Sequence, residues 1–158
     1  MLEDSDTAKG QLQRVDHLIY VTLKYTRTID VINNTLSRLI EAMDYIFLDI
    51  LEIAKRKKMI NIIPQSHVER IEIIEKKLFK NNKKIKEWVK LYLLMRKIVK
   101  NKIKGREEYR KNVTLIAEKV EVNQEKLMSY FVSTKEFYQF SREWIDKNGG
   151  MAWKEEDT

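Results

Sequence analysis

The chain has 158 residues, a length typical of one domain with a single hydrophobic core, and it carries a net charge of +7. Its four glycines and one proline are too few for the many tight turns of a β-sandwich or a β-barrel. Because cysteine is absent, disulfides, thiolate metal sites and cysteine nucleophiles are excluded.

The sequence has no feature of a membrane or exported protein. Its apolar runs are far shorter than the roughly 18 residues that a transmembrane helix needs. The first ten residues lack the basic start and the apolar stretch of a signal peptide. We therefore expect a cytoplasmic protein without a membrane partner.

Two stretches of helical periodicity fill the first 57 residues. On a helical wheel the second apolar stripe is rotated from the first, so one straight helix could not turn both stripes toward one partner. We expect a long helical pair with a kink or break between Arg27 and Thr35. The stripes consist of Leu12, Val15, Ile19, Leu23 and Thr26, and of Ile29, Ile32, Leu36, Leu39, Ile40, Met43, Phe47, Ile50, Leu51 and Ala54.

A capping box marks the start of the next helix. Ser66 is followed three residues later by Glu69, and this pattern predicts a short helix that ends near residue 80. The following helix should run from Lys83 to Lys104. Gly105 comes directly after it, where a helix commonly ends with a left-handed residue.

The last long helix is predicted to begin at the cap Asn123 and to stop at residues 148–150, which read Asn-Gly-Gly. No long stretch alternates with the two-residue period of a strand. The sequence thus predicts an all-α domain over residues 1–150, a bundle of five to six helices, followed by a flexible acidic tail at residues 151–158.

Positive charge is concentrated in one part of the chain. Residues 76–111 contain 15 Lys or Arg and three acidic residues, whereas the remainder contains 16 basic and 21 acidic residues. Six lysines of the expected helix 83–104 fall within a stripe of about 100°, a pattern that indicates phosphate binding but is also common on solvated helices. The predicted nucleic-acid-binding residues are Lys83, Lys86, Lys90, Lys97, Lys100, Lys104, Arg110 and Lys111.

Other titratable residues do not form a known catalytic or metal-binding pattern. Arg96 lies at the edge of an apolar stripe, so its guanidinium needs an acidic partner such as Asp44 or Asp49, or a function. His17 and His67 lie in unrelated segments and are expected at the surface. We expect no catalytic residues, no metal and no cofactor.

The order of these elements resembles the HEPN superfamily of small helical bundles, most closely its archaeal PaREP-like members. The resemblance spans roughly Tyr25 to Ile145 and includes the Leu-Leu-Met-Arg-Lys sequence at residues 93–97 and the Glu-Tyr-Arg sequence at residues 108–110. It implies dimerisation and, for some members, a nucleotidyltransferase as partner. Active HEPN ribonucleases place His four to six residues after an Arg.

This chain has Asn101 after Arg96 and Asn112 after Arg106 at those positions. Because a neutral amide cannot replace an imidazole in proton transfer, we expect no enzymatic activity. Surplus aromatic residues on the last helix also favour a homodimer. The resulting prediction is a non-catalytic HEPN-type interaction module whose basic face binds nucleic acid or an acidic partner protein.

An alternative reading starts from residues 116–130. They are similar to a helix-turn-helix, with Ile116 and Ala117 in the first helix and Gln124 and Lys126 at the start of the recognition helix. Glu121 stands in the turn, where many such motifs have glycine. This alternative predicts a DNA-binding transcriptional regulator.

Overall fold

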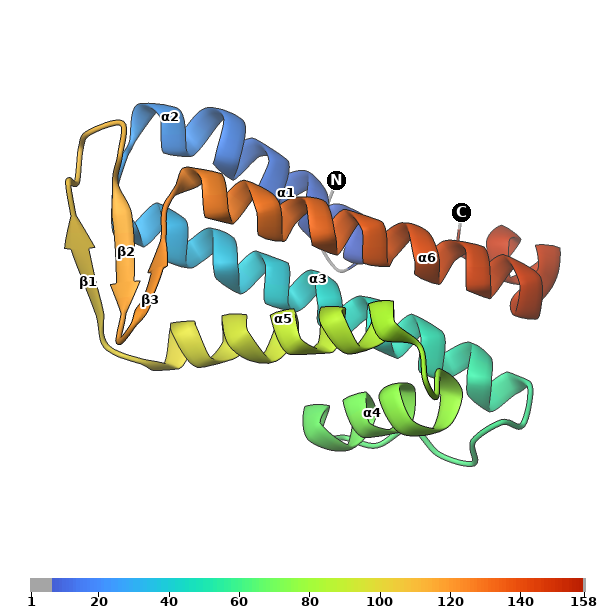
Figure 1. Cartoon of the computed structure of the whole chain (residues 1–158). Coiled ribbons are helices and arrows are strands. Elements are labelled where there is room, and N and C mark those ends of the chain that lie inside the picture. Colours follow the sequence, from blue (N-terminus) through green and yellow to red (C-terminus); the bar gives the residue numbers. More distant parts are fainter. Residues whose placement is uncertain (1–6, 158) are drawn as a thin grey trace.

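A computed structural model describes residues 7–157 (Figure 1). The first helical segment consists of α1 (Ala8–His17), a π-helical turn (Leu18–Thr22) and α2 (Leu23–Tyr25). The chain breaks at residues 26–28, and the next helix starts where the Thr28 hydroxyl accepts the Val31 amide. The predicted break is confirmed, at the start of the interval that the sequence indicated.

Helix α3 (Ile29–Arg56) is the central element of the bundle. It packs against α1 and α6 on one side and against α5 and α4 on the other (Figure 1). Half of its residues are buried, and the fully buried ones recur at three- and four-residue intervals, as the apolar stripe predicted. Helix α3 therefore contacts α1, α4, α5 and α6 and forms the centre of the bundle.

The connection after α3 leads to α4 (His67–Ile73), a π-helical turn (Ile74–Leu78) and α5 (Lys83–Lys100). The predicted cap is confirmed, because the Ser66 hydroxyl accepts the Val68 amide at 3.2 Å. Asn82 caps α5 in the same way through the Ile85 amide, at 3.1 Å. Helix α5 ends at Lys100, four residues before the predicted end.

A small antiparallel sheet follows α5, and it contradicts a purely all-α fold. Its strands are β1 (Ile103–Arg106), β2 (Thr114–Ala117) and β3 (Val120–Val122), in the spatial order β1-β2-β3. Gly105 lies in β1 opposite Leu115, so its predicted role after a helix end is wrong. The sheet closes the end of the bundle where α2 gives way to α3 (Figure 1).

The sheet also removes the basis of the helix-turn-helix alternative. Ile116 and Ala117 belong to β2, and Glu121 pairs with Ile116 across the hairpin instead of joining two helices. The predicted first helix and its turn are thus a β-hairpin, so the helix-turn-helix prediction is wrong.

Helix α6 (Gln124–Asp157) returns along the bundle beside α1 and α3. The predicted cap is confirmed, because the Asn123 side chain accepts the Lys126 amide at 2.8 Å. The helix continues through Gly149, so residues 148–150 do not end it as predicted. Glycine in a helix costs only about 1 kcal/mol relative to alanine, which a long helix tolerates. Thr158 of the predicted tail lies outside the described residues.

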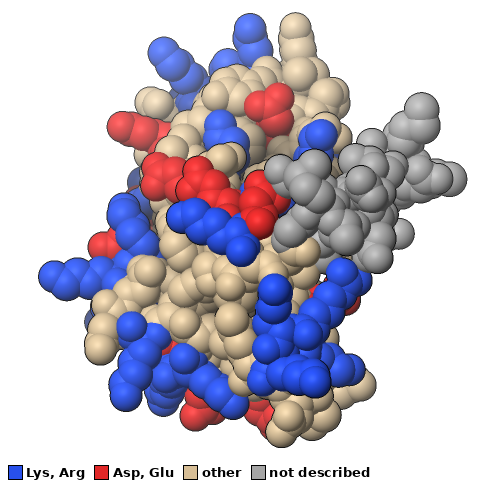
Figure 2. Space-filling view, turned by 90° about the vertical axis from the view of Figure 1, so that its right-hand side faces the viewer, with Lys and Arg blue, Asp and Glu red and all other residues tan. Residues whose placement is uncertain are grey.

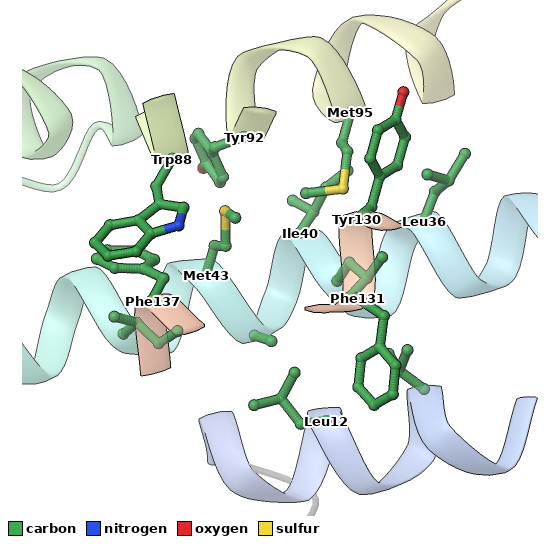
Figure 3. Packing of buried hydrophobic residues seen from close by; sticks show 14 of the residues in the cluster. Leu12, Leu36, Ile40, Met43, Trp88, Tyr92, Met95, Tyr130, Phe131 and Phe137 are labelled. Carbon is green, nitrogen blue, oxygen red and sulfur yellow. The ribbon is translucent and has the colours of Figure 1, made fainter. Parts of the chain in front are cut away.

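Aromatic residues of α6 pack inside the chain. Phe137 stacks on Trp88 with ring centroids 4.9 Å apart and meets Phe47 at 5.4 Å (Figure 3). Phe140 and Trp144 both contact the ring of Phe79. The aromatic surplus that favoured a dimer is therefore accommodated within one chain, and the homodimer prediction now depends on the family resemblance alone.

Candidate nucleic-acid interface

Five of the predicted lysines form an exposed row on α5, and we call Lys83, Lys86, Lys90, Lys97 and Lys100 the α5 lysine strip. The opposite side of the helix is buried, because Ile85, Trp88, Tyr92 and Met95 point into the core. The strip spans about 25 Å, given the rise of an α-helix per residue. It thus presents a row of cations to solvent along the whole helix.

None of these five ammonium groups has an acidic partner within the part of the chain that the structure describes. The ion pair found on α5 itself joins Lys84 and Glu87, at 3.8 Å, and lies beside the strip. The positive charge of the strip is therefore available to an external anion.

The remaining three predicted residues lie on other elements. Lys104 is on β1 and is exposed, so its predicted place in the helical stripe is wrong. Arg110 and Lys111 are exposed in the loop between β1 and β2. Since β1 directly follows α5, basic side chains continue from the strip along this strand to the loop.

The basic surface also extends past the other end of the strip. Figure 2 views this end of the bundle, and Lys and Arg side chains gather in its lower part, below a band of acidic residues. The exposed lysines of this region lie at residues 55–58, at the end of α3, and at residues 76–84, which lead into α5. This end of the bundle thus adds exposed lysines beyond the strip, among which Lys76 and Lys84 are paired with Glu72 and Glu87.

Arg96 lies on the inner edge of α5, next to the strip, and is half-buried. Its Nη1 donates to the Tyr92 hydroxyl at 3.4 Å, and that hydroxyl donates to the Asp44 carboxylate at 2.5 Å. The predicted contact with Asp44 is thus made through Tyr92. Because the Tyr92 ring is fully buried, its hydroxyl holds the Arg96 guanidinium in place beside the five exposed lysines.

The environment shifts the pKa values of this cluster. Burial raises the pKa of the Asp44 carboxyl, against the opposing effects of the Tyr92 hydrogen bond and of Arg96. Burial, followed by the charge of Arg96, lowers the pKa of His67, whose ring lies 6.2 Å from that of Tyr92. His67 was predicted at the surface, and the structure instead turns it toward α5 from the first turn of α4. The shift favours the uncharged form of the His67 imidazole.

Asn101, which stands where the family pattern has histidine, lies on another side of α5. It lines a cavity of about 140 Å³ together with Lys97 and the β2–β3 turn at residues 117–120. Arg96 instead faces Asp44 on α3. The two positions of the family's Arg-and-His pattern therefore do not face a common space.

A second hollow lies between α1 and α6, on a different side of the bundle. This open groove has a volume of about 430 Å³ and is lined by Leu12 and Phe131, with Lys9 and Lys135 at its rim. Lys135 is directed over the Phe131 ring, 4.4 Å from its centroid. The groove thus has two lysines, Lys9 and Lys135, and one of them already contacts an aromatic ring of the protein, unlike the lysines of the α5 lysine strip.

No group of three His, Asp or Glu side chains among residues 7–149 is placed to hold a metal ion. Within the same range, none of the helices combines the length and the apolar character needed to cross a membrane.

Comparisons with known proteins found no match among family models, curated proteins or solved structures. The resemblance to the HEPN superfamily therefore stays a prediction.

Proposed function

We propose that this protein is a non-catalytic module that binds nucleic acid by its phosphate backbone along the α5 lysine strip. The observation that carries the proposal is a row of five exposed lysines that have no acidic partner among the described side chains, on a helix whose other face is buried. Phosphates of a polynucleotide are a regular row of anions, which such a row of ammonium groups complements.

Arg96 supports this proposal in a different way from the lysines. A guanidinium has five N–H donors in a planar fork, and Arg96 uses one of them on the Tyr92 hydroxyl. The side chain is therefore pre-positioned to give a directional phosphate contact beside the more mobile lysines. We propose that Arg96 binds a phosphate of the strand and takes no part in a reaction.

Binding through phosphates should not depend on base sequence and should weaken steeply with salt. For a single strand each phosphate contact contributes a slope of about −0.7 in a plot of log K against log salt concentration. If all five lysines of the strip make contact, they together contribute a slope of about −3.5.

The experiment is a fluorescence-anisotropy titration of labelled RNA and DNA of mixed sequence, from about 50 mM salt upward. We compare the wild type with a variant in which Lys86, Lys90 and Lys97 are changed to Glu. The proposal predicts a sequence-independent affinity that falls in this variant, with a slope reduced by about 2.

The matched control changes Lys9, Lys135 and Lys147 to Glu, which removes the same charge from exposed positions on α1 and α6. It should retain most of the wild-type affinity. Equal losses in both variants would contradict a localised site. No binding at low salt would refute nucleic-acid binding and leave an acidic protein as partner, and RNA cleavage lost on Arg96→Ala would refute the non-catalytic assignment.

A further inference from the structure

Two tyrosine rings are exposed at the sheet end of the bundle. Tyr25, the last residue of α2, is 80% exposed, and Tyr109, in the β1–β2 loop, is 77% exposed. Tyr20 is 54% exposed, and the other aromatic residues among residues 7–149 are buried or partly buried. We call Tyr25 and Tyr109 the tyrosine edge.

The backbone brings these two residues to the same edge. The Tyr109 amide donates to the Arg27 carbonyl at 2.5 Å, only two residues beyond Tyr25. Two residues of extended chain span at most about 7 Å, so both rings project from neighbouring backbone. Figure 1 shows the β1–β2 loop reaching the end of α2 in this way.

The loop is held against the bundle and is not simply a loose connection. The Glu108 carboxylate accepts the Ile29 amide at 3.0 Å and so caps the first turn of α3. Glu107 and Tyr109 adopt left-handed backbone angles, with φ of 54° and 67°, which residues other than glycine rarely do. Strain of this kind persists where surrounding contacts fix the conformation, so the loop presents the Tyr109 ring from a defined position.

Basic side chains surround the tyrosine edge. Lys24, Arg110 and Lys111 are exposed next to the two rings in sequence and have no acidic partner among the side chains of residues 7–149. Lys104 on β1 links this edge to the α5 lysine strip. The neighbouring Glu108 carboxylate is engaged at the start of α3. The surface thus combines exposed aromatic faces with cations that continue a phosphate-binding row.

We propose that the tyrosine edge stacks unpaired bases, so that the ligand is single-stranded nucleic acid. This inference rests on the proposed function, since the α5 lysine strip would hold the phosphates of the same strand. Every base has an aromatic face that a tyrosine can cover, and such stacking tolerates any sequence. The bases of a duplex are already stacked on each other, so a duplex could use the lysines but not the tyrosine edge.

The test uses fluorescence anisotropy with three probes of equal length: an unstructured single strand of thymidines, a single strand of abasic sites, and a duplex. The abasic strand keeps the phosphates and lacks the bases. The protein variants are Tyr25→Leu and Tyr109→Leu, with Tyr25→Phe and Tyr109→Phe as controls that keep the rings. Thermal melting by circular dichroism checks that each variant is folded.

The inference predicts that the wild type binds thymidines at least about fivefold more tightly than abasic sites, the smallest effect expected of one stacked base. Each Leu variant should lose at least about fivefold on thymidines and be unchanged on the abasic strand, while each Phe variant matches the wild type. Two results would overturn this inference and leave the proposed function standing, provided that binding still depends on the lysines. One is equal affinity for the thymidine strand and the abasic strand, and the other is an affinity for thymidines that neither Leu variant changes. If changing Lys86, Lys90 and Lys97 to Glu weakened binding to none of the three probes, the proposed function itself would be overturned.

Discussion

Asp44 offers a direct test of the polar cluster beside the α5 lysine strip. Its carboxylate accepts the hydroxyl hydrogen of Tyr92, whose ring is fully buried between α3 and α5. Asp44→Ala would leave that hydroxyl without its acceptor, whereas Asp44→Asn keeps an acceptor oxygen in the same place and removes the charge. The two variants therefore separate the hydrogen bond from the buried charge.

The structure gives the expected size of each effect. Leaving a buried donor without a partner costs about 1–3 kcal/mol. For a domain of this length 1 kcal/mol shifts Tm by about 2–4 °C, so Asp44→Ala should lower Tm by about 2–12 °C. Burial raises the pKa of Asp44, which means that the folded state disfavours its ionised form. Asp44→Asn should therefore be at least as stable as the wild type at neutral pH.

The raised pKa of Asp44 also predicts how the difference in Tm between Asp44→Asn and the wild type depends on pH. Because the pKa of Asp44 in the folded state lies above its ordinary 3.8, the folded state binds the proton more tightly than the unfolded state does. Ionisation of Asp44 then lowers stability as the pH rises from 3.8 through the folded pKa. Asn does not titrate, so the Tm of Asp44→Asn relative to that of the wild type should increase across this window.

Thermal melts followed by circular dichroism, in buffers from about pH 3 to pH 7, measure these differences. Two results would refute the reasoning. One is an Asp44→Asn variant as unstable as Asp44→Ala, which would mean that the charge and not the hydrogen bond stabilises the cluster. The other is a relative Tm of Asp44→Asn that falls as the pH rises.

Three further predictions concern other parts of the molecule. Trp88→Ala should lower the free energy of unfolding by about 3–5 kcal/mol, measured by urea denaturation, because it empties the aromatic core; a loss under 1 kcal/mol would contradict the packing described. Glu108→Ala should cost about 1 kcal/mol by removing the acceptor of the Ile29 amide, and an unchanged Tm would show that the loop does not cap α3. Asn101→His should not create RNA cleavage, because residue 101 and Arg96 lie on different sides of α5, and cleavage in a gel assay would show otherwise.

The helices were predictable because their signals are local. Ser66 and Asn123 carry short polar side chains directly before amphipathic stretches, and both cap helices as expected. The row of lysines on α5 follows from helical spacing in the same way. The prediction was wrong only at Lys104, because Gly105 was read as a residue that follows a helix instead of a strand residue.

The sheet was missed because its turns lack the usual residues. Two-residue hairpin turns favour Asn-Gly or Asp-Gly, since these residues adopt positive φ easily. The β2–β3 turn has Glu118, with φ of 53°, followed by Lys119. Strands of three or four residues are also too short for alternation to be distinctive. The hydrogen bond between Asp44 and Tyr92 could not be predicted from local sequence signals, because it joins residues 48 positions apart.

The most direct test of the central claim is to map the bound strand on the protein. Backbone amide resonances of the 19.0 kDa chain can be followed by NMR while an unstructured single strand of thymidines is added. Shifts should concentrate in residues 83–111, on α5, β1 and the β1–β2 loop, and at Tyr25 in α2, and they should spare the groove between α1 and α6. Shifts centred on that groove, or no shifts at low salt, would contradict the claim.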